Sequence, residues 1–254
     1  MQALAPIFTR PIAHRGLHNA ARAIVENSIS AARAAIAAGY GIECDVQLSQ
    51  DGDIVVFHDD ALERLTQDTG LVREKSGAQL RAQKLNGGDD HIPGFDAFLG
   101  VIAGRAPLVV EIKSAFDGET LTAQRVAESL AFYDGPVAIK SFDPAMIAFL
   151  RAEGRNLNVS HIPLGVVAEA HYDTDDWSSL SARQRQEMTH FLHYPRTRPD
   201  FVSWSVNDLP NAIPFLARAG LHLPVMTWTV RTQAHASLAA QWADQIVFEG
   251  FDPA

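Results

Sequence analysis

The stretch GIECDVQLSQDGDIVVFHD, residues 41–59, decides most of what the sequence predicts about the fold. Its first part alternates in polarity, so that Glu43, Asp45 and Gln47 share one face of a predicted strand. Cys44 and its aliphatic neighbours occupy the other face, which predicts packing beneath helices. We therefore expect a barrel strand whose acidic face points inward and whose apolar face points outward.

The second part of this stretch predicts a β-hairpin. The seven residues after Val46 are too few for a parallel crossover but suit a hairpin, with Asp51-Gly52 as the turn. Folding about that turn places Val46 roughly opposite Val55, and Glu43 roughly opposite His58. His58 is therefore expected to face the acidic pair.

Outside this stretch, short apolar runs alternate with helical periodicity. Three segments, Ala34–Asp45, Ala148–Ser160 and Ala217–Thr229, share an Ala-rich helix, a terminal glycine with an expected left-handed cap, and a strand. Such repeats predict parallel strands with helices outside, in a closed (β/α)8 barrel or an open doubly wound sheet. Length and strand number favour the barrel. No Gly-rich phosphate loop follows the first strand, which weakens the open-sheet interpretation. The expected strands are 11–14, 41–47, 54–58, 107–113, 136–141, 157–167, 201–205, 224–230 and 245–249, of which the hairpin supplies the ninth.

Composition narrows the class of protein. The 254 residues, 47% hydrophobic and without a linker, predict a single domain over 1–254 with insertions near 60–106 and 171–199. The net charge of −9, with no basic tract, argues against nucleic acid. No apolar run is long enough to predict a transmembrane segment, and Cys44 alone allows no intrachain disulfide. We expect a soluble, cytoplasmic protein with a small-molecule substrate, and the sequence predicts no oligomeric state.

Acidic side chains on two inward faces predict a cation site. Glu43 and Asp45 lie ~7 Å apart along their strand, which is costly inside a barrel unless a cation or proton compensates. Glu111 and Lys113 share one face of another strand, with Lys113 nearer its C-terminal end. Oxygen ligands suit Mg²⁺ or Ca²⁺. The plain alternatives are a structural salt bridge for the acids and a structural pairing of Lys113 with Glu111.

Two histidines at predicted strand ends could move protons near neutral pH. A single inward His14 or His58 is more often a satisfied core residue, but the two together beside acids favour catalysis. Arg15 and Lys113 would add charge-assisted phosphate contacts. Asp59 either orients its neighbour or caps the chain. Late on their strands, Trp228 could form core or substrate wall, and Trp204 is the weaker candidate for a wall.

At this point the ordered motifs resemble a known family, the glycerophosphodiester phosphodiesterases. The match extends over nearly the whole chain and is densest over residues 12–66. One departure lies at the last strand, where the family has an acidic residue after a Thr and this chain reads Val247-Phe248-Glu249-Gly250. The matching segments are His14-Arg15-Gly16, Glu26-Asn27-Ser28, Ile42-Glu43-Cys44-Asp45-Val46, Asp51-Gly52, Val55-Val56-Phe57-His58-Asp59 and Glu111-Ile112-Lys113.

The resemblance implies a barrel enzyme that hydrolyses glycerophosphodiesters to glycerol 3-phosphate and an alcohol. It implies that the substrate's neighbouring hydroxyl attacks phosphorus to give a cyclic phosphate, which water then opens. It assigns one divalent cation to Glu43, Asp45 and Glu111, acid–base catalysis to His14 as base and His58 as acid, and phosphate contacts to Arg15 and Lys113. Two alternatives remain: a lyase that stops at the cyclic phosphate, as in related phospholipase C and sphingomyelinase D enzymes, and a non-catalytic protein that binds a phosphorylated ligand.

Overall fold

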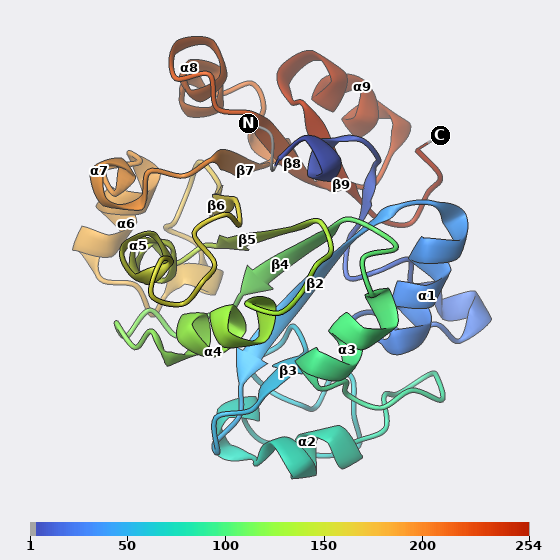
Figure 1. Ribbon diagram of the computed structural model, residues 1–254. Coiled ribbons are helices and arrows are strands. Elements are labelled where there is room, and N and C mark those ends of the chain that lie inside the picture. The colour runs from blue at the N-terminus through green and yellow to red at the C-terminus, as the bar shows by residue number, and fades with distance from the viewer. Residues whose placement is uncertain (1–3, 254) are drawn as a thin grey trace.

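A closed barrel of eight parallel strands forms the centre of the computed structural model, which describes residues 4–253 (Figure 1). The strands pair in the order β1-β2-β4-β5-β6-β7-β8-β9, and β9 pairs with β1 to close the ring. The predicted (β/α)8 barrel is therefore confirmed. The strands are β1 (Ile12–Ala13), β2 (Gly41–Leu48), β4 (Leu108–Ile112), β5 (Val137–Ser141), β6 (Leu164–Ala168), β7 (Phe201–Ser205), β8 (Val225–Val230) and β9 (Gln245–Phe248).

Helices surround the barrel (Figure 1).

The sequence predicted a left-handed cap after three of these helices. Of the three, only Gly39 has this conformation, with φ of 78°. Gly154 has φ of −55°, and Gly220 is the last helical residue. The strand expected over 157–167 begins only at Leu164, because turns follow Gly154. The helices are α1 (Ile29–Ala38), α2 (Gly77–Ala82), α3 (Phe95–Ile102), α4 (Leu121–Leu130), α5 (Pro144–Glu153), α6 (Ala182–Thr189), α7 (Tyr194–Thr197), α8 (Ala212–Gly220) and α9 (Gln233–Trp242).

The predicted hairpin is present, but its register is one residue away from the expected one. β3 (Ile54–Val56) runs antiparallel to β2, and Val46 pairs with Val56 rather than with Val55. The reason is the loop, which Ser49 and Asp53 close over three residues with Gly52 at φ of 90°. The hairpin is thus centred on Asp51, so Leu48 pairs with Ile54 and Val46 with Val56.

Apolar side chains fill the end of the barrel where the strands begin. A short 3-10 helix, η1 (Ala5–Phe8), places the buried Ile7 against this layer. The Gln245 side chain holds that segment by donating to the carbonyls of Ile7 and Arg10. This end is therefore closed, and polar chemistry is left to the other end. The layer comprises Leu4, Ile7, Ile12, Val109, Ala138, Phe201, Met226 and Val247.

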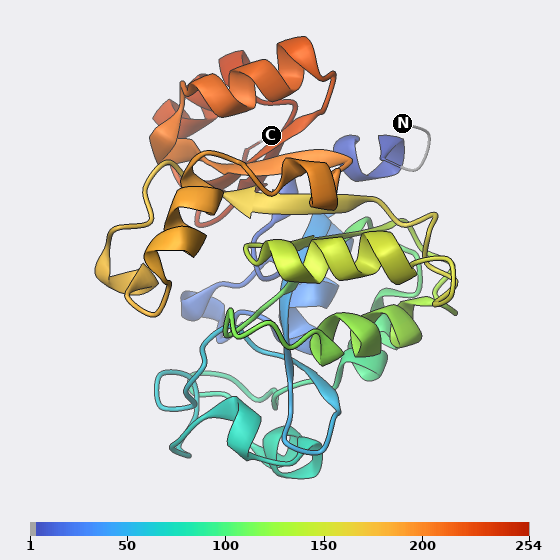
Figure 2. The same cartoon turned by 90° about the vertical axis from the view of Figure 1, so that its left-hand side faces the viewer.

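Two long connections lie between strands of the barrel. Between β3 and β4, the chain carries α2 and α3, and Figure 2 shows the hairpin and the α2 segment projecting together from one side. Between β6 and β7, α6 packs on a small cluster in which Tyr172 and Trp177 lie near Phe142, and α7 packs against α5. No helix within residues 4–253 is long and apolar enough to cross a membrane.

Candidate functional site

Strand register brings the three predicted acids together. On adjacent strands β2, β4 and β5, Asp45 pairs with Glu111, and Glu111 pairs with Lys140. Glu43 lies two residues before Asp45 and shares its face. One oxygen from each of the three buried carboxylates lies within 4.8 Å of the others. The sequence prediction that these acids meet inside the barrel is confirmed.

Two lysines neutralise part of this cluster. The ammonium of Lys113 lies 3.0 Å from Asp45 Oδ1 and 2.7 Å from Glu111 Oε1. Burial would raise the pKa of Asp45, but Lys113, ahead of other nearby positive charges, holds that pKa well below its usual range. Burial opposes ionisation of Glu111 as well, but Lys113 and Lys140 lower its pKa to about 2. Asp45 and Glu111 are therefore both anionic at neutral pH.

The loop between β1 and α1 is tied to the same acids. The backbone N–H of Arg15 donates to Glu43 Oε2 over 3.0 Å, and the Asn27 side chain donates to Asp45 Oδ2 over 2.9 Å. Arg15 and Asn27 both have left-handed backbones, with φ of 54° and 55°. This conformation is costly for Arg15, whereas Asn adopts it more readily, and the contacts with the acids stabilise the loop that carries His14.

A carboxylate that lies far away in the sequence orients His14. Glu249, directly after β9, places Oε2 2.8 Å from His14 Nδ1 and 3.0 Å from the guanidinium of Arg231. The hydrogen bond with His14 lowers the pKa of Glu249 to about 2, against an opposing effect of burial. Because Nδ1 is occupied, the other ring nitrogen of His14 is left for the site.

His58 is held in a similar way, by its neighbour. Asp59 Oδ1 lies 2.7 Å from His58 Nδ1, and Arg64 pairs with the same carboxylate. Gln47 fixes the backbone on both sides of His58 by donating to the carbonyls of Phe57, over 3.0 Å, and of Asp59, over 2.7 Å. The inward face of β2 therefore has two roles: Gln47 positions His58, and Glu43 and Asp45 supply the acids.

A cavity of about 160 Å³ is lined by all the predicted site residues except Glu43, which lies buried behind it. It holds both histidines, and the predicted wall residue Trp228 lines it beside Phe142, whose ring centroid is 5.3 Å away. Trp204 instead packs in the barrel-to-helix core, as does Cys44. The lining residues are His14, Arg15, Asp45, His58, Glu111, Lys113, Lys140, Phe142, Ser205, Asn207, Trp228, Thr229 and Arg231.

Sequence reasoning missed several residues of this site, of which Lys140, Glu249 and Asn27 make the contacts described above. Lys140 shares the inward parity of the predicted strand 136–141, which is a signal that could have identified it. Glu249 has the parity of the inward Val247. Asn27 lies within a recognised motif, but its bond to Asp45 depends on tertiary structure.

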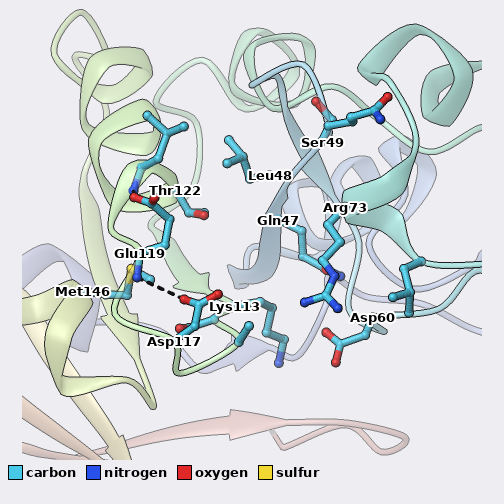
Figure 3. A pocket seen from close by; sticks show the side chains of 15 residues that line it. Gln47, Leu48, Ser49, Asp60, Arg73, Lys113, Asp117, Glu119, Thr122 and Met146 are labelled. Atoms are coloured by element: carbon cyan, nitrogen blue, oxygen red, sulfur yellow. Dashed lines mark hydrogen bonds between the residues drawn. The ribbon is translucent and has the colours of Figure 1, made fainter.

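A second, larger cavity of about 430 Å³ adjoins the first, and Lys113 belongs to both linings. Figure 3 shows Gln47, Asp60 and Arg73 along one wall and Asp117 near Lys113 on the other. It lies between the end of β2, the segment after His58 and the loop that follows β4. The small cavity therefore adjoins additional volume, and binding of glycerol and phosphate alone would not require that volume.

The carboxylate cluster fits a hard divalent cation. All three donors are oxygens at suitable separations, which is the set that Mg²⁺ and Ca²⁺ prefer. Glu43 Oε1 is buried and accepts no hydrogen bond from the described residues. The only positive charge at this oxygen among the described residues is the Lys140 ammonium, 3.1 Å away, so the oxygen retains capacity to act as a ligand of a cation.

Comparison with known proteins agrees with this geometry. The chain belongs to the glycerophosphoryl diester phosphodiesterase family, whose model matches residues 14–250. YhdW of Bacillus subtilis, provisionally named a glycerophosphodiester phosphodiesterase, is 36% identical over 248 residues, covering 93% of this chain and 92% of that protein. A glycerophosphodiester phosphodiesterase of Caldanaerobacter subterraneus is 35% identical over 116 residues, which cover 42% of this chain and 46% of that relative. The chain is thus similar to enzymes, as predicted.

Solved structures show the same fold. A phosphodiesterase of Oleispira antarctica, solved in complex with the product sn-glycerol-3-phosphate, has a TM-score of 0.75 at 22% identity and covers 94% of this chain and 92% of its own. A glycerophosphodiester phosphodiesterase of Thermotoga maritima has a TM-score of 0.67 at 21% identity, covering 93% and 92%.

Proposed function

We propose that this protein hydrolyses glycerophosphodiesters to glycerol 3-phosphate and an alcohol, with His14 and His58 as proton carriers and a divalent cation on the carboxylates. Family membership supports the reaction class. The product complex of the Oleispira antarctica phosphodiesterase supports sn-glycerol-3-phosphate as the product. The observation that carries the residue roles is the pairing of two carboxylate-oriented histidines with the acidic cluster in one small cavity.

Glu43, Asp45 and Glu111 would hold Mg²⁺ or Ca²⁺. When bound, such a cation polarises phosphoryl oxygens and stabilises the negative charge that develops on them. Lys113 and Arg15 line the same cavity and add fixed positive charge for the phosphate. The two side chains would therefore share phosphate binding with a cation held by the acids.

In the first half-reaction, His14 accepts the proton of the glycerol hydroxyl next to the phosphoester. That oxygen attacks phosphorus, the bond to the alcohol oxygen breaks, and His58 donates its proton to the departing oxygen. The product bound at this stage is a cyclic phosphate. Glu249 stabilises the imidazolium that forms at His14.

In the second half-reaction, the two histidines exchange roles. His58, now neutral, accepts a proton from water, and the water oxygen attacks phosphorus. The ring P–O bond breaks, and His14 returns its proton to the released hydroxyl. Both histidines end in their starting states, so one water molecule is consumed in each cycle and the products are glycerol 3-phosphate and the free alcohol.

The test is turnover of glycerophosphocholine by H14N and H58N in the presence of Mg²⁺ or Ca²⁺. Each variant should lose about 10²- to 10⁴-fold in kcat, because general acid–base catalysis contributes that much. H222N, at an exposed histidine, is the control and should match wild type. A loss below about tenfold in both site variants, with folding intact by circular dichroism, contradicts the assigned roles.

A further inference from the structure

Lys140 is a fully buried lysine at the centre of the carboxylate cluster. It lies on β5, and its ammonium is 3.1 Å from Glu43 Oε1 and 3.0 Å from Glu111 Oε2. Only 1% of the residue is exposed, although it contributes to the lining of the small cavity. A lysine is rarely buried to this extent without paired acids, and here both of its partners belong to the proposed cation site.

The position of this ammonium has an electrostatic consequence. Glu43 Oε1, which accepts no hydrogen bond from the described residues, has Lys140 as its ion-pair partner. Glu111 divides its two oxygens between Lys113 and Lys140. The lysines therefore supply positive charge that a divalent cation would otherwise supply. A cation that enters the cluster meets two fixed like charges in a desolvated site, where charge interactions are strong.

We propose that Lys140 acts as a built-in cation of the carboxylate cluster: it holds Glu43 and Glu111 in position without a metal ion, and it weakens the cluster's affinity for Mg²⁺ and Ca²⁺. The inference rests on the cation site of the proposed function. Lys140 is a positioning residue, because it acts through the two acids. Its removal should leave the cluster with uncompensated negative charge, which makes the metal-free protein less stable and cation binding tighter.

The experiment is calorimetric titration of MgCl2 and CaCl2 into wild type, K140M and K140Q without substrate. K75M is the matched control, because it removes the same charge at a surface pair with Asp68. K140R retains the charge. We expect Kd to fall by at least about tenfold, or about 1.4 kcal/mol, in K140M and K140Q, and to stay within about threefold of wild type in K75M and K140R. Without cation, the Tm of K140M should be the lowest of the set.

Equal or weaker cation binding by K140M and K140Q overturns the inference, as does absence of binding by every protein in the set. K140Q retains a polar end at the position, so it keeps the test open if K140M does not fold. Failure of the proposed function is seen separately, as absence of glycerophosphodiester turnover by wild type. That result does not alter the comparison of cation affinities.

The larger cavity supports a second inference, from an independent observation. His58 is the proposed donor to the departing alcohol, and the segment that follows it supplies Asp60 to the cavity wall (Figure 3). Gln47, which fixes the backbone around His58, lines the same wall. The larger cavity therefore lies on the side of the scissile bond that carries the departing alcohol.

The lining of this cavity has a particular chemistry. It combines acceptors from Gln47 Oε1 and the carboxylates of Asp60, Asp117 and Glu119 with donors from Arg73 and Lys113. Arg73 forms no ion pair with a carboxylate within residues 4–253. None of the described lining residues is aromatic. Quaternary ammonium groups are recognised by aromatic cages, whereas several hydroxyls need mixed donors and acceptors. We infer that the cavity binds the alcohol moiety and favours a hydroxyl-rich one, an inference that rests on the proposed function.

A115W, which adds bulk at an exposed lining position, tests this inference, and A97W on the outer face of α3 is the control. The measured quantity is the ratio of kcat/KM for glycerophosphoinositol to that for glycerophosphoethanolamine. We expect A115W to lower this ratio by at least about tenfold and A97W to leave it unchanged. An unchanged ratio in A115W, or a wild-type preference for the ethanolamine substrate, overturns this inference but leaves the proposed function standing. Absence of turnover of either substrate by wild type overturns the proposed function and this inference with it.

Discussion

Replacement of Glu249 by Gln should slow catalysis without weakening substrate binding. Glu249 contacts His14 Nδ1 at 2.8 Å, on the opposite side of the ring from the nitrogen that would meet substrate. Gln has the same shape but no charge, so it stabilises the His14 imidazolium less well. A hydrogen bond to a charged group contributes about 1.5–3 kcal/mol. Because about 1.4 kcal/mol is tenfold in rate, kcat should fall about tenfold to a hundredfold.

The assay is release of glycerol 3-phosphate from glycerophosphocholine at saturating Mg²⁺, with kcat and KM measured separately. KM should stay within about twofold, because uniform binding is untouched. E128Q, on the surface of α4, is the matched control and should behave as wild type. A kcat for E249Q within about twofold of wild type, or a loss that appears only in KM, would refute the orienting role of Glu249.

Three further predictions concern stability. G16A should lower the free energy of unfolding by about 2–4 kcal/mol in a urea titration, because Gly16 has φ of 76° and a Cβ would lie 2.8 Å from that of Ala31; an unchanged midpoint contradicts this. Q47L should cost about 1–3 kcal/mol and lower kcat, because two carbonyls around His58 lose their donor; a loss of kcat without a loss of stability would refute the stability part. The pKa of Glu249 falls from 4.5 to about 2 on folding, so its contribution is complete above pH 4.5 and is lost as the pH falls toward 2. As the pH falls from 4.5 toward 2, the free energy of unfolding of E249Q should therefore decrease less than that of wild type. Parallel curves of unfolding free energy against pH would contradict the assignment of this pKa shift to Glu249.

Local periodicity was sufficient to predict the inward faces of the barrel strands. Alternation along β2 is a property of neighbouring residues, so Glu43 and Asp45 could be placed on one face without knowledge of the partner strands. The same argument placed Glu111 and Lys113. Their meeting follows once the strands are parallel neighbours, because the carboxyl ends of such strands lie at one end of a barrel.

Contacts that depend on register or on barrel closure could not be derived in this way. Glu249 meets His14 across 235 positions, because β9 pairs with β1 to close the ring. Lys140 has the inward parity of its strand, but its pairing with Glu111 depends on the register between β4 and β5. The hairpin register differed by one because an Asp-Gly dipeptide indicates a turn without fixing which residues on either side of it pair, and here Ser49 pairs with Asp53.

The central claim is that the carboxylate and histidine site cleaves glycerophosphodiesters with a divalent cation. The most direct measurement is phosphorus NMR of purified protein with glycerophosphocholine and glycerophosphoethanolamine, in Mg²⁺ or Ca²⁺ and then in EDTA. The account predicts that the glycerol 3-phosphate resonance grows with metal and stops growing with EDTA. A cyclic phosphate that persists would identify a lyase instead, and no change in either substrate with any metal would contradict the claim.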